Sequence, residues 1–231
     1  MKFTGDDRPP AGWRRFAEAF WLLARFWHGF GHLGPRGAKD GPPALVIPGF
    51  IATDRTTLEL RRALAEAGWR VHGWDMGWNM GAKADTIERL KARLDAISGG
   101  QSVLLVGWSL GGVFARELAR SVPDKVRAVV TLGSPFSGDQ HQNNVWRLYE
   151  WIAGHKVDQP PIPRVYGKPP VPCLALWSRK DGIVAVRAAR GLDDERDQTV
   201  EIGCSHMAFA ISRRATRRVV REIDIFLKNA S

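Results

Sequence analysis

The sequence predicts a three-layer α/β fold in which helices cover both faces of a mostly parallel, six-stranded sheet. From about residue 44 onward, short apolar runs alternate with longer stretches whose apolar residues recur at helical spacing. Strands separated by helices are typical of parallel sheets. The chain has 231 residues, 44% hydrophobic and 25% charged. This is ordinary composition for one globular domain with a well-buried core, and it excludes a disordered chain, a collagen or a coiled coil.

Six short runs are expected to form the strands. Each is rich in apolar or β-branched residues and is bounded by glycine, proline or polar residues, as in the buried strands of a parallel sheet. The runs cover residues 44–47, 69–72, 102–106, 126–132, 173–177 and 199–202.

Four stretches between or after these runs have the spacing of amphipathic helices. They cover residues 56–67, 84–97, 110–121 and 206–228. In the second of them, Leu90, Leu94 and Ile97 recur at intervals of three and four residues, which places them on one helical face. Gly68 follows the first stretch and Gly99 the second, and glycine is common just past the end of a helix.

Two segments fall outside this alternation. Residues 1–43 are aromatic and basic and are interpreted as an N-terminal helical extension. Residues 136–170 are too long for an ordinary connection between a helix and a strand, and they hold one expected helix (144–153) followed by a proline-rich exit. The sequence therefore predicts a domain over residues 44–231 with a short cap insertion at about 136–170.

The net charge of +10 does not by itself indicate a nucleic-acid partner. No nucleic-acid-binding motif accompanies it, and the arginines near the C-terminus are spaced to form the solvated face of a helix.

The aromatic and basic residues near the N-terminus could lie on an anionic membrane surface, although docking on the flank of the sheet is favoured. The composition does not indicate an oligomeric state.

No apolar run is long enough to span a membrane, and the N-terminus lacks the layout of a signal peptide, so a cytoplasmic location is expected. His28 and His32 have a spacing that could bind a metal, but no third ligand lies near them in the sequence. We therefore expect neither a metal nor a cofactor.

A Gly-x-Ser-x-Gly motif carries the clearest indication of chemistry. Gly107, Ser109 and Gly111 follow an apolar run and precede a helical stretch, which is the context that a nucleophilic serine in a strand–turn–helix requires. The turn strains the serine backbone, and its neighbours two positions away must be small. Ser109 is therefore the predicted nucleophile.

A serine hydroxyl needs a base, and the base needs a carboxylate to orient it. Asp181 lies in a polar turn directly after the fifth run, and His206 follows the last run. The chain order Ser109, Asp181, His206 is the one found in this architecture. The other candidate acids, Asp75, Asp139, Asp193 and Asp194, are better interpreted as surface charges.

Two backbone N–H groups are expected to stabilise the oxyanion of a tetrahedral intermediate. One belongs to Leu110, the residue after the nucleophile. The other is assigned to Phe50, in the sharp turn that follows the first run.

Together, these residues resemble the α/β-hydrolase superfamily, in particular its small serine esterases and lipases. The resemblance covers roughly residues 44–228 and depends on Pro48-Gly49-Phe50, Gly107 to Gly111, Asp181 and His206. It implies the α/β-hydrolase fold and hydrolysis of an acyl bond through an acyl-enzyme. Many relatives have His-Gly where this chain has Pro48-Gly49, and this departure could change substrate choice.

The expected activity is that of a serine carboxylesterase acting on short- to medium-chain acyl esters of small molecules. The alternatives are a lipase or membrane-facing deacylase, an acyltransferase with the same triad, and a non-catalytic binding protein on the same scaffold. An apolar substrate group would suit the aromatic residues expected near the site. They are Trp74, Trp78, Trp108, Phe136 and Trp146.

Overall fold

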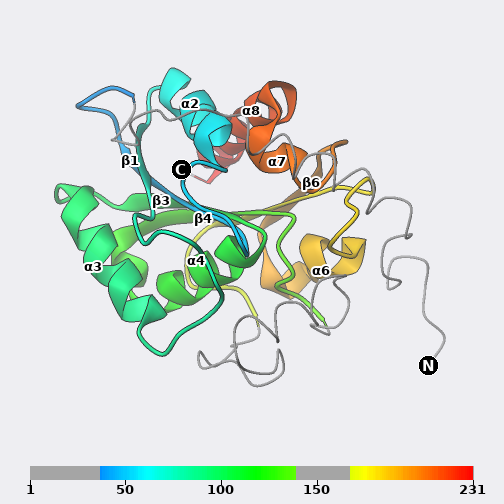
Figure 1. Ribbon diagram of the computed structural model, residues 1–231, viewed down its shortest axis with the longest axis horizontal. Coiled ribbons are helices and arrows are strands. Elements are labelled where there is room, and N and C mark those ends of the chain that lie inside the picture. The colour runs from blue at the N-terminus through cyan, green and yellow to red at the C-terminus, as the bar shows by residue number, and fades with distance from the viewer. Residues whose placement is uncertain (1–36, 139–166, 231) are drawn as a thin grey trace.

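The computed structural model describes residues 37–138 and 167–230. Most of the predicted N-terminal extension and most of the predicted cap, including the helix expected at residues 144–153, lie outside the described residues. Figure 1 shows three layers, with the sheet between α2, α7 and α8 on one face and α3, α4 and α6 on the other. The predicted three-layer α/β fold is confirmed.

All six predicted strands are present in one sheet. They are β1 (Pro43–Ile47), β2 (Arg70–Gly73), β3 (Val103–Trp108), β4 (Val126–Leu132), β5 (Cys173–Trp177) and β6 (Gln198–Glu201). Their order is β2-β1-β3-β4-β5-β6, and every neighbouring pair is parallel. The carboxyl ends of the strands therefore lie along one edge of the sheet, where loops far apart in the sequence meet.

The α-helices of the described residues are α2 (Leu58–Glu66), α3 (Thr86–Ser98), α4 (Leu110–Ser121), α6 (Val186–Arg190), α7 (Ala208–Ile211) and α8 (Arg213–Asn229). Two short 3₁₀ helices, Pro123–Lys125 and Asp193–Glu195, complete the set. No helix among the described residues is both long and apolar enough to cross a membrane.

The prediction of one continuous helix over residues 206–228 was wrong. The backbone of Ser212 is extended (φ −90°, ψ 117°), which ends α7, and the Ser212 hydroxyl accepts a hydrogen bond from the Ala215 N–H. Serine is a preferred helix N-cap because its side chain satisfies an N–H group that has no partner within the helix. The continuous apolar periodicity of this region did not reveal the break.

The core has one apolar layer on each face of the sheet, because successive side chains of a strand point to opposite faces. In β1, Val46 packs in the layer formed with α2, α7 and α8, whereas Leu45 and Ile47 pack in the layer formed with α3 and α4. β1, β3 and β5 are buried along their whole length. This explains why the strands read as uninterrupted apolar runs rather than as alternating ones.

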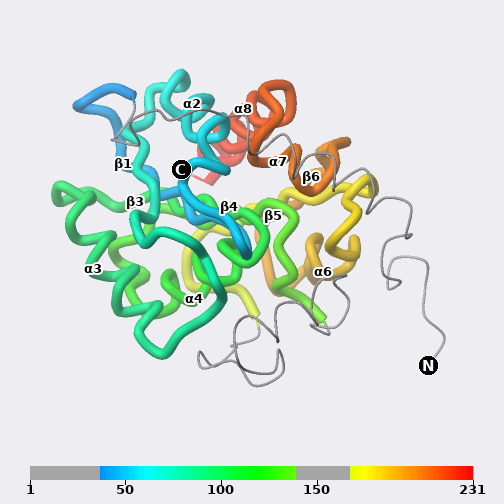
Figure 2. The backbone as a smooth tube through the Cα atoms, viewed as in Figure 1, coloured from blue at the N-terminus to red at the C-terminus, as the bar shows by residue number. Residues whose placement is uncertain are grey.

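The helices after β1 and β3 leave the sheet on opposite faces. Residues of α2 belong to one apolar layer and residues of α4 to the other, although β1 and β3 are neighbours. The two loops therefore diverge, and in parallel α/β sheets such a point of divergence leaves a crevice in which ligands bind. Figure 2 follows the chain through these crossings.

His72 on β2 is a partly buried histidine in a positively charged setting. Its Nε2 atom has no hydrogen-bond partner within the described part of the chain. Burial lowers the pKa of His72 to about 4, and the charges of Arg93 and Arg70 add to this effect. Since an unfolded histidine has a pKa of ~6.5, acid protonates the unfolded chain first. The stability contributed by neutral His72 is therefore complete above pH 6.5 and is lost as the pH falls from 6.5 towards 4.

We predict that His72→Leu protects the protein against mild acid. Leucine cannot take up a proton, so the melting temperature of the variant should fall less than that of the wild type between pH 7.5 and pH 4.5. Differential scanning fluorimetry across this pH range measures the melting temperatures of the variant and the wild type. A difference in melting temperature that does not change with pH would show that His72 does not contribute to acid sensitivity.

Candidate active site

Ser109 occupies the turn between β3 and α4 with a strained backbone. Its φ and ψ angles are 55° and −125°, a combination that costs a non-glycine residue about 1–3 kcal/mol. The Ser109 N–H donates to the Leu132 carbonyl at the end of β4 (2.9 Å). The serine is half-buried and directly precedes the first turn of α4, so its side chain lies at the carboxyl edge of the sheet.

Three glycines allow the backbone to approach closely enough to form this turn. A Cβ atom on Gly107 would lie 2.3 Å from the Gly112 Cα, and one on Gly111 would lie 2.2 Å from the Ile47 carbonyl oxygen. A Cβ atom on Gly112 would lie 2.0 Å from the Ser134 hydroxyl oxygen. The first two glycines confirm the sequence argument that the neighbours of Ser109 must be small. The third requirement was not visible from the motif.

Asp181 and His206 form a buried pair in the loops after β5 and β6. The His206 Nδ1 and Asp181 Oδ2 atoms are 2.8 Å apart, and both residues are only 2% exposed. The second carboxylate oxygen of Asp181, Oδ1, accepts hydrogen bonds from the N–H groups of Ile183 and Val184, both at 2.8 Å. The carboxylate is thus held in one orientation and accepts from the imidazole on its remaining side.

Trp108 supports the histidine from the strand that ends at the serine. Its ring centroid lies 5.5 Å from that of His206, and its indole N–H donates to the His206 carbonyl (3.1 Å). Trp108 is 3% exposed. Sequence reasoning assigned Trp108 to the substrate-binding wall, whereas the structure shows that it also contacts His206, the predicted base.

Gly133 connects the serine turn with the acid–imidazole pair. It follows Leu132, which accepts from the Ser109 N–H, and its own N–H donates to the Leu176 carbonyl at the end of β5 (2.9 Å). A Cβ atom on Gly133 would lie 2.8 Å from Asp181 Oδ2 and 3.2 Å from His206 Nδ1. The predicted nucleophile, acid and base therefore lie in loops that meet around the turn after β4.

The loop after β1 lies against Ser109. A Cβ atom on Gly49 would come within 2.9 Å of the Ser109 Cβ atom, so the backbone of this loop adjoins the serine, and Phe50 is the next residue. Leu110 is the first residue of α4, where N–H groups have no partner within the helix. Leu110 thus adjoins the serine in sequence, and Phe50 belongs to a loop whose backbone adjoins the serine in space.

The aromatic residues predicted to bind substrate differ in exposure. Trp74 and Phe136 are 4% exposed, and Trp78 is 56% exposed. The Arg116 guanidinium lies 4.3 Å from the centre of the Phe136 ring, and the Trp74 indole N–H donates to the Gly77 carbonyl (3.0 Å). Trp146 lies outside the described residues. Contact of these residues with a substrate stays a prediction.

Sequence reasoning missed three polar residues that hold the surrounding loops. Asp54 accepts from the N–H groups of Trp74 and Asp75 (3.0 Å each), and burial raises its pKa although Arg61 opposes the rise. The Ser178 hydroxyl accepts from the Lys180 and Cys204 N–H groups, which joins the acid loop to the histidine loop.

The third of these residues, Asn79, joins the loops after β1 and β2. None of the three belongs to a recognisable motif, because their partners lie in loops distant in sequence or are backbone groups.

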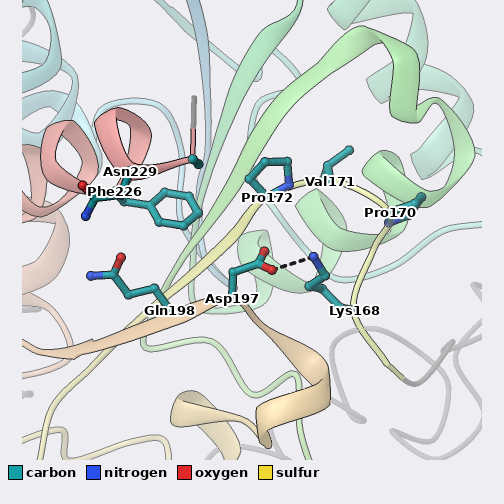
Figure 3. A pocket seen from close by; sticks show the side chains of 9 residues that line it. Lys168, Pro170, Val171, Pro172, Asp197, Gln198, Phe226 and Asn229 are labelled. Atoms are coloured by element: carbon teal, nitrogen blue, oxygen red, sulfur yellow. Dashed lines mark hydrogen bonds and ion pairs between the residues drawn. The ribbon is translucent and has the colours of Figure 1, made fainter.

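A hollow of about 510 Å³ lies away from this site. It is bounded by Pro172 before β5, by Gln198 at the start of β6 and by Phe226 near the end of α8. Figure 3 shows the Lys168–Asp197 ion pair (2.7 Å) on its wall. Since this hollow lies at the amino ends of the strands, Ser109 does not adjoin it.

Comparison with known proteins agrees with the observed fold. Residues 42–155 match the sequence profile of the family described as the alpha/beta hydrolase fold. A search of curated proteins found no match. Together with the observed sheet and its helices, the match shows that the chain has the α/β-hydrolase fold, as the sequence resemblance predicted.

Solved structures of the same fold include a bacterial membrane phospholipase A described as a virulence factor (17% identity, TM-score 0.61). The matched region covers 94% of this chain and 91% of the phospholipase chain. Carboxylesterase CesB from Bacillus subtilis is 15% identical, with a TM-score of 0.56 and coverages of 90% and 96%. A thioesterase domain from the curacin biosynthetic pathway is 13% identical, with a TM-score of 0.59 and coverages of 81% and 93%. At these identities the likeness establishes the fold.

We predict that Gly133→Ala disrupts the acid–imidazole pair. A side chain at φ +52° is strained by about 1–2 kcal/mol, and its Cβ atom would press on Asp181 Oδ2. Thermal unfolding measures the loss of stability, and the downfield imidazole N–H signal in proton NMR spectra reports the Asp181–His206 hydrogen bond.

Gly203→Ala is the matched control, because it lies in the histidine loop and an added Cβ atom would meet nothing within 4 Å. It should leave both the stability and the NMR signal close to those of the wild type. An unchanged NMR signal in Gly133→Ala would contradict the crowding argument.

Proposed function

We propose that this hydrolase is a serine carboxylesterase that cleaves short- to medium-chain acyl esters through an acyl-enzyme. The observation that carries the proposal is the buried Asp181–His206 hydrogen bond, whose histidine contacts Trp108, the residue before a serine in strained backbone conformation. A carboxylate that accepts from Nδ1 leaves Nε2 of the same imidazole as the acceptor, which is the tautomer a general base requires.

The first half of the reaction forms the acyl-enzyme. His206 Nε2 takes the proton of the Ser109 hydroxyl as Oγ bonds to the ester carbonyl carbon, and the carbonyl π electrons move to oxygen. The Phe50 and Leu110 N–H groups donate to this oxyanion. When the tetrahedral intermediate collapses, the C–O bond to the alcohol breaks, and the imidazolium returns its proton to the leaving alkoxide.

The second half is the same sequence with water as the nucleophile. His206 removes a proton from water, whose oxygen attacks the acyl carbon, and the Ser109 Oγ leaves with the proton that the imidazolium returns. Asp181 stays ionised throughout and stabilises the transient imidazolium. Its carboxylate is well suited to this role because its oxygens accept from two backbone N–H groups and one imidazole.

The names of the structural neighbours support an acyl-bond substrate. They include carboxylesterases, a thioesterase domain and a phospholipase A. The thioesterase shares the same acyl chemistry but releases a thiol, so thioesters belong in the substrate panel. Aromatic residues near the loops after β2 and β4 favour an apolar substrate group.

We predict that Ser109→Ala lowers ester hydrolysis by at least about 10⁴-fold, because removal of a triad nucleophile leaves only the contribution of binding and the oxyanion hole. The measurement is turnover of p-nitrophenyl esters across a series of acyl lengths. A fluorophosphonate should add to wild-type Ser109 with loss of fluoride, and mass spectrometry should locate it on the peptide containing residue 109.

Ser102→Ala, which removes an exposed hydroxyl just before β3, is the control and should keep full activity and labelling. Hydrolysis that survives in Ser109→Ala at the wild-type rate would end the proposal. Added alcohol or amine acceptors test the acyltransferase alternative, because product would then partition from the acid to the new ester or amide.

The second candidate function is that of a lipase or deacylase that works at a membrane surface. The structural likeness to a membrane phospholipase A and the aromatic, basic composition of residues 1–43 favour it. It predicts binding to vesicles that contain anionic lipid, weakened as salt screens the charges. Sedimentation with such vesicles measures this, and a variant without residues 1–40 that binds equally well would exclude this role for the segment.

A further inference from the structure

Asn79 connects the loops after β1 and β2 through its side-chain amide and both of its backbone groups. It lies after β2, is fully buried, and donates from Nδ2 to the Pro48 carbonyl oxygen (2.8 Å). Its Oδ1 atom accepts from the Gly81 N–H (3.2 Å), which fixes the amide plane. Its backbone carbonyl accepts from the Ile51 N–H, and its backbone N–H donates to the Ala52 carbonyl, both at 2.8 Å.

These contacts enclose the peptide that carries the predicted oxyanion donor. The Pro48 carbonyl belongs to the peptide before Gly49, and the Ile51 N–H belongs to the peptide after Phe50. Asn79 thus fixes the peptide groups on either side of the Gly49–Phe50 peptide, while Gly49 itself adjoins Ser109. With both flanking peptides held, the direction of the Phe50 N–H is restricted.

The loop needs this restraint because its conformation is strained. Ile51 has a φ of +52°, which is a genuine outlier for a β-branched residue and costs about 1–3 kcal/mol. Without the bonds to Asn79, the loop could relax by rotating the peptides on either side of Ile51, one of which joins Ile51 to Phe50. Removal of the side chain would leave the backbone bonds to Ile51 and Ala52, so the effect of the amide on Pro48 can be tested separately.

We propose that Asn79 is a positioning residue that sets the oxyanion hole by holding the loop from Pro48 to Ala52 against the loop after β2. This inference rests on the proposed esterase function. Asparagine suits the role because its short side chain supplies a donor and an acceptor together. Asn79 acts through the backbone of Phe50, and its loss should impair the stabilisation of the oxyanion more than substrate binding.

The test compares Asn79→Ala and Asn79→Asp with the wild type. Aspartate is isosteric and keeps the acceptor for the Gly81 N–H, but it cannot donate to the Pro48 carbonyl. We expect both variants to lower kcat about 10- to 100-fold with little change in KM. The Phe50 N–H would still be present but misdirected, so part of the stabilisation of the oxyanion would be lost. The affinity for a trifluoromethyl ketone, whose adduct with Ser109 carries an oxyanion, should fall by a similar factor.

Thr86→Val is the matched control. Its hydroxyl is buried and accepts from the Lys83 N–H (2.8 Å) in the same segment after β2, so the variant loses a buried hydrogen bond without touching the loop after β1. It should lower the melting temperature while leaving kcat and ketone affinity unchanged. The pH dependence of kcat/KM should be the same in all variants, since the Asp181–His206 pair is not altered.

The inference fails if Asn79→Ala and Asn79→Asp lower the melting temperature but keep ketone affinity within about twofold of the wild type. A fall in activity with unchanged ketone affinity would also overturn it, since Asn79 would then support the fold alone. Failure of the esterase proposal looks different, because Ser109→Ala would then retain activity and the ketone would not inhibit the wild type. If Asn79→Ala does not fold, the isosteric aspartate variant provides the same measurements.

Discussion

The close approach of backbones after β3 is the constraint on which the rest of the site depends. The turn brings Gly107 and Gly112 into contact, presses Gly111 against the end of β1 and leaves Ser109 at a positive φ. None of these contacts tolerates a Cβ atom without movement of backbone or of Ser134. Because β1 and β4 both lie beside β3, the same crowding that strains the serine also fixes the loops after those two strands around it.

The buried carboxylate of Asp181 is tolerated at this edge because hydrogen-bond donors surround it. An isolated carboxylate loses several kcal/mol of solvation on burial, but Asp181 accepts from two backbone N–H groups and from His206. Trp108 and Ser178 complete the arrangement by holding His206 and the loop that carries it. The predicted acid and base are therefore held in place by the protein itself, which is what efficient proton transfer would require.

The parts of this molecule that sequence could predict are those set by local pattern. The buried strands are recognisable because both faces are covered. The turn that carries Ser109 is recognisable because its glycines and its strand–helix context lie within a few residues. Asn79, Asp54 and Ser178 could not be predicted, because each contacts backbone atoms in loops that come together only when the sheet forms. The break at Ser212 was missed because the apolar periodicity continues across it, and only the N-cap hydroxyl marks it.

Backbone strain in the described residues is concentrated at the same edge. The non-glycine residues there with positive φ are Ile51, Asp75 and Ser109, in the loops after β1, β2 and β3. Such conformations persist only where surrounding contacts over-determine them. Asn79 binds the Ile51 N–H, Asp54 binds the Asp75 N–H, and Leu132 binds the Ser109 N–H. Each strained residue is thus held by an acceptor from another loop or strand, so the buried core stabilises a carboxyl edge whose local conformations are individually unfavourable.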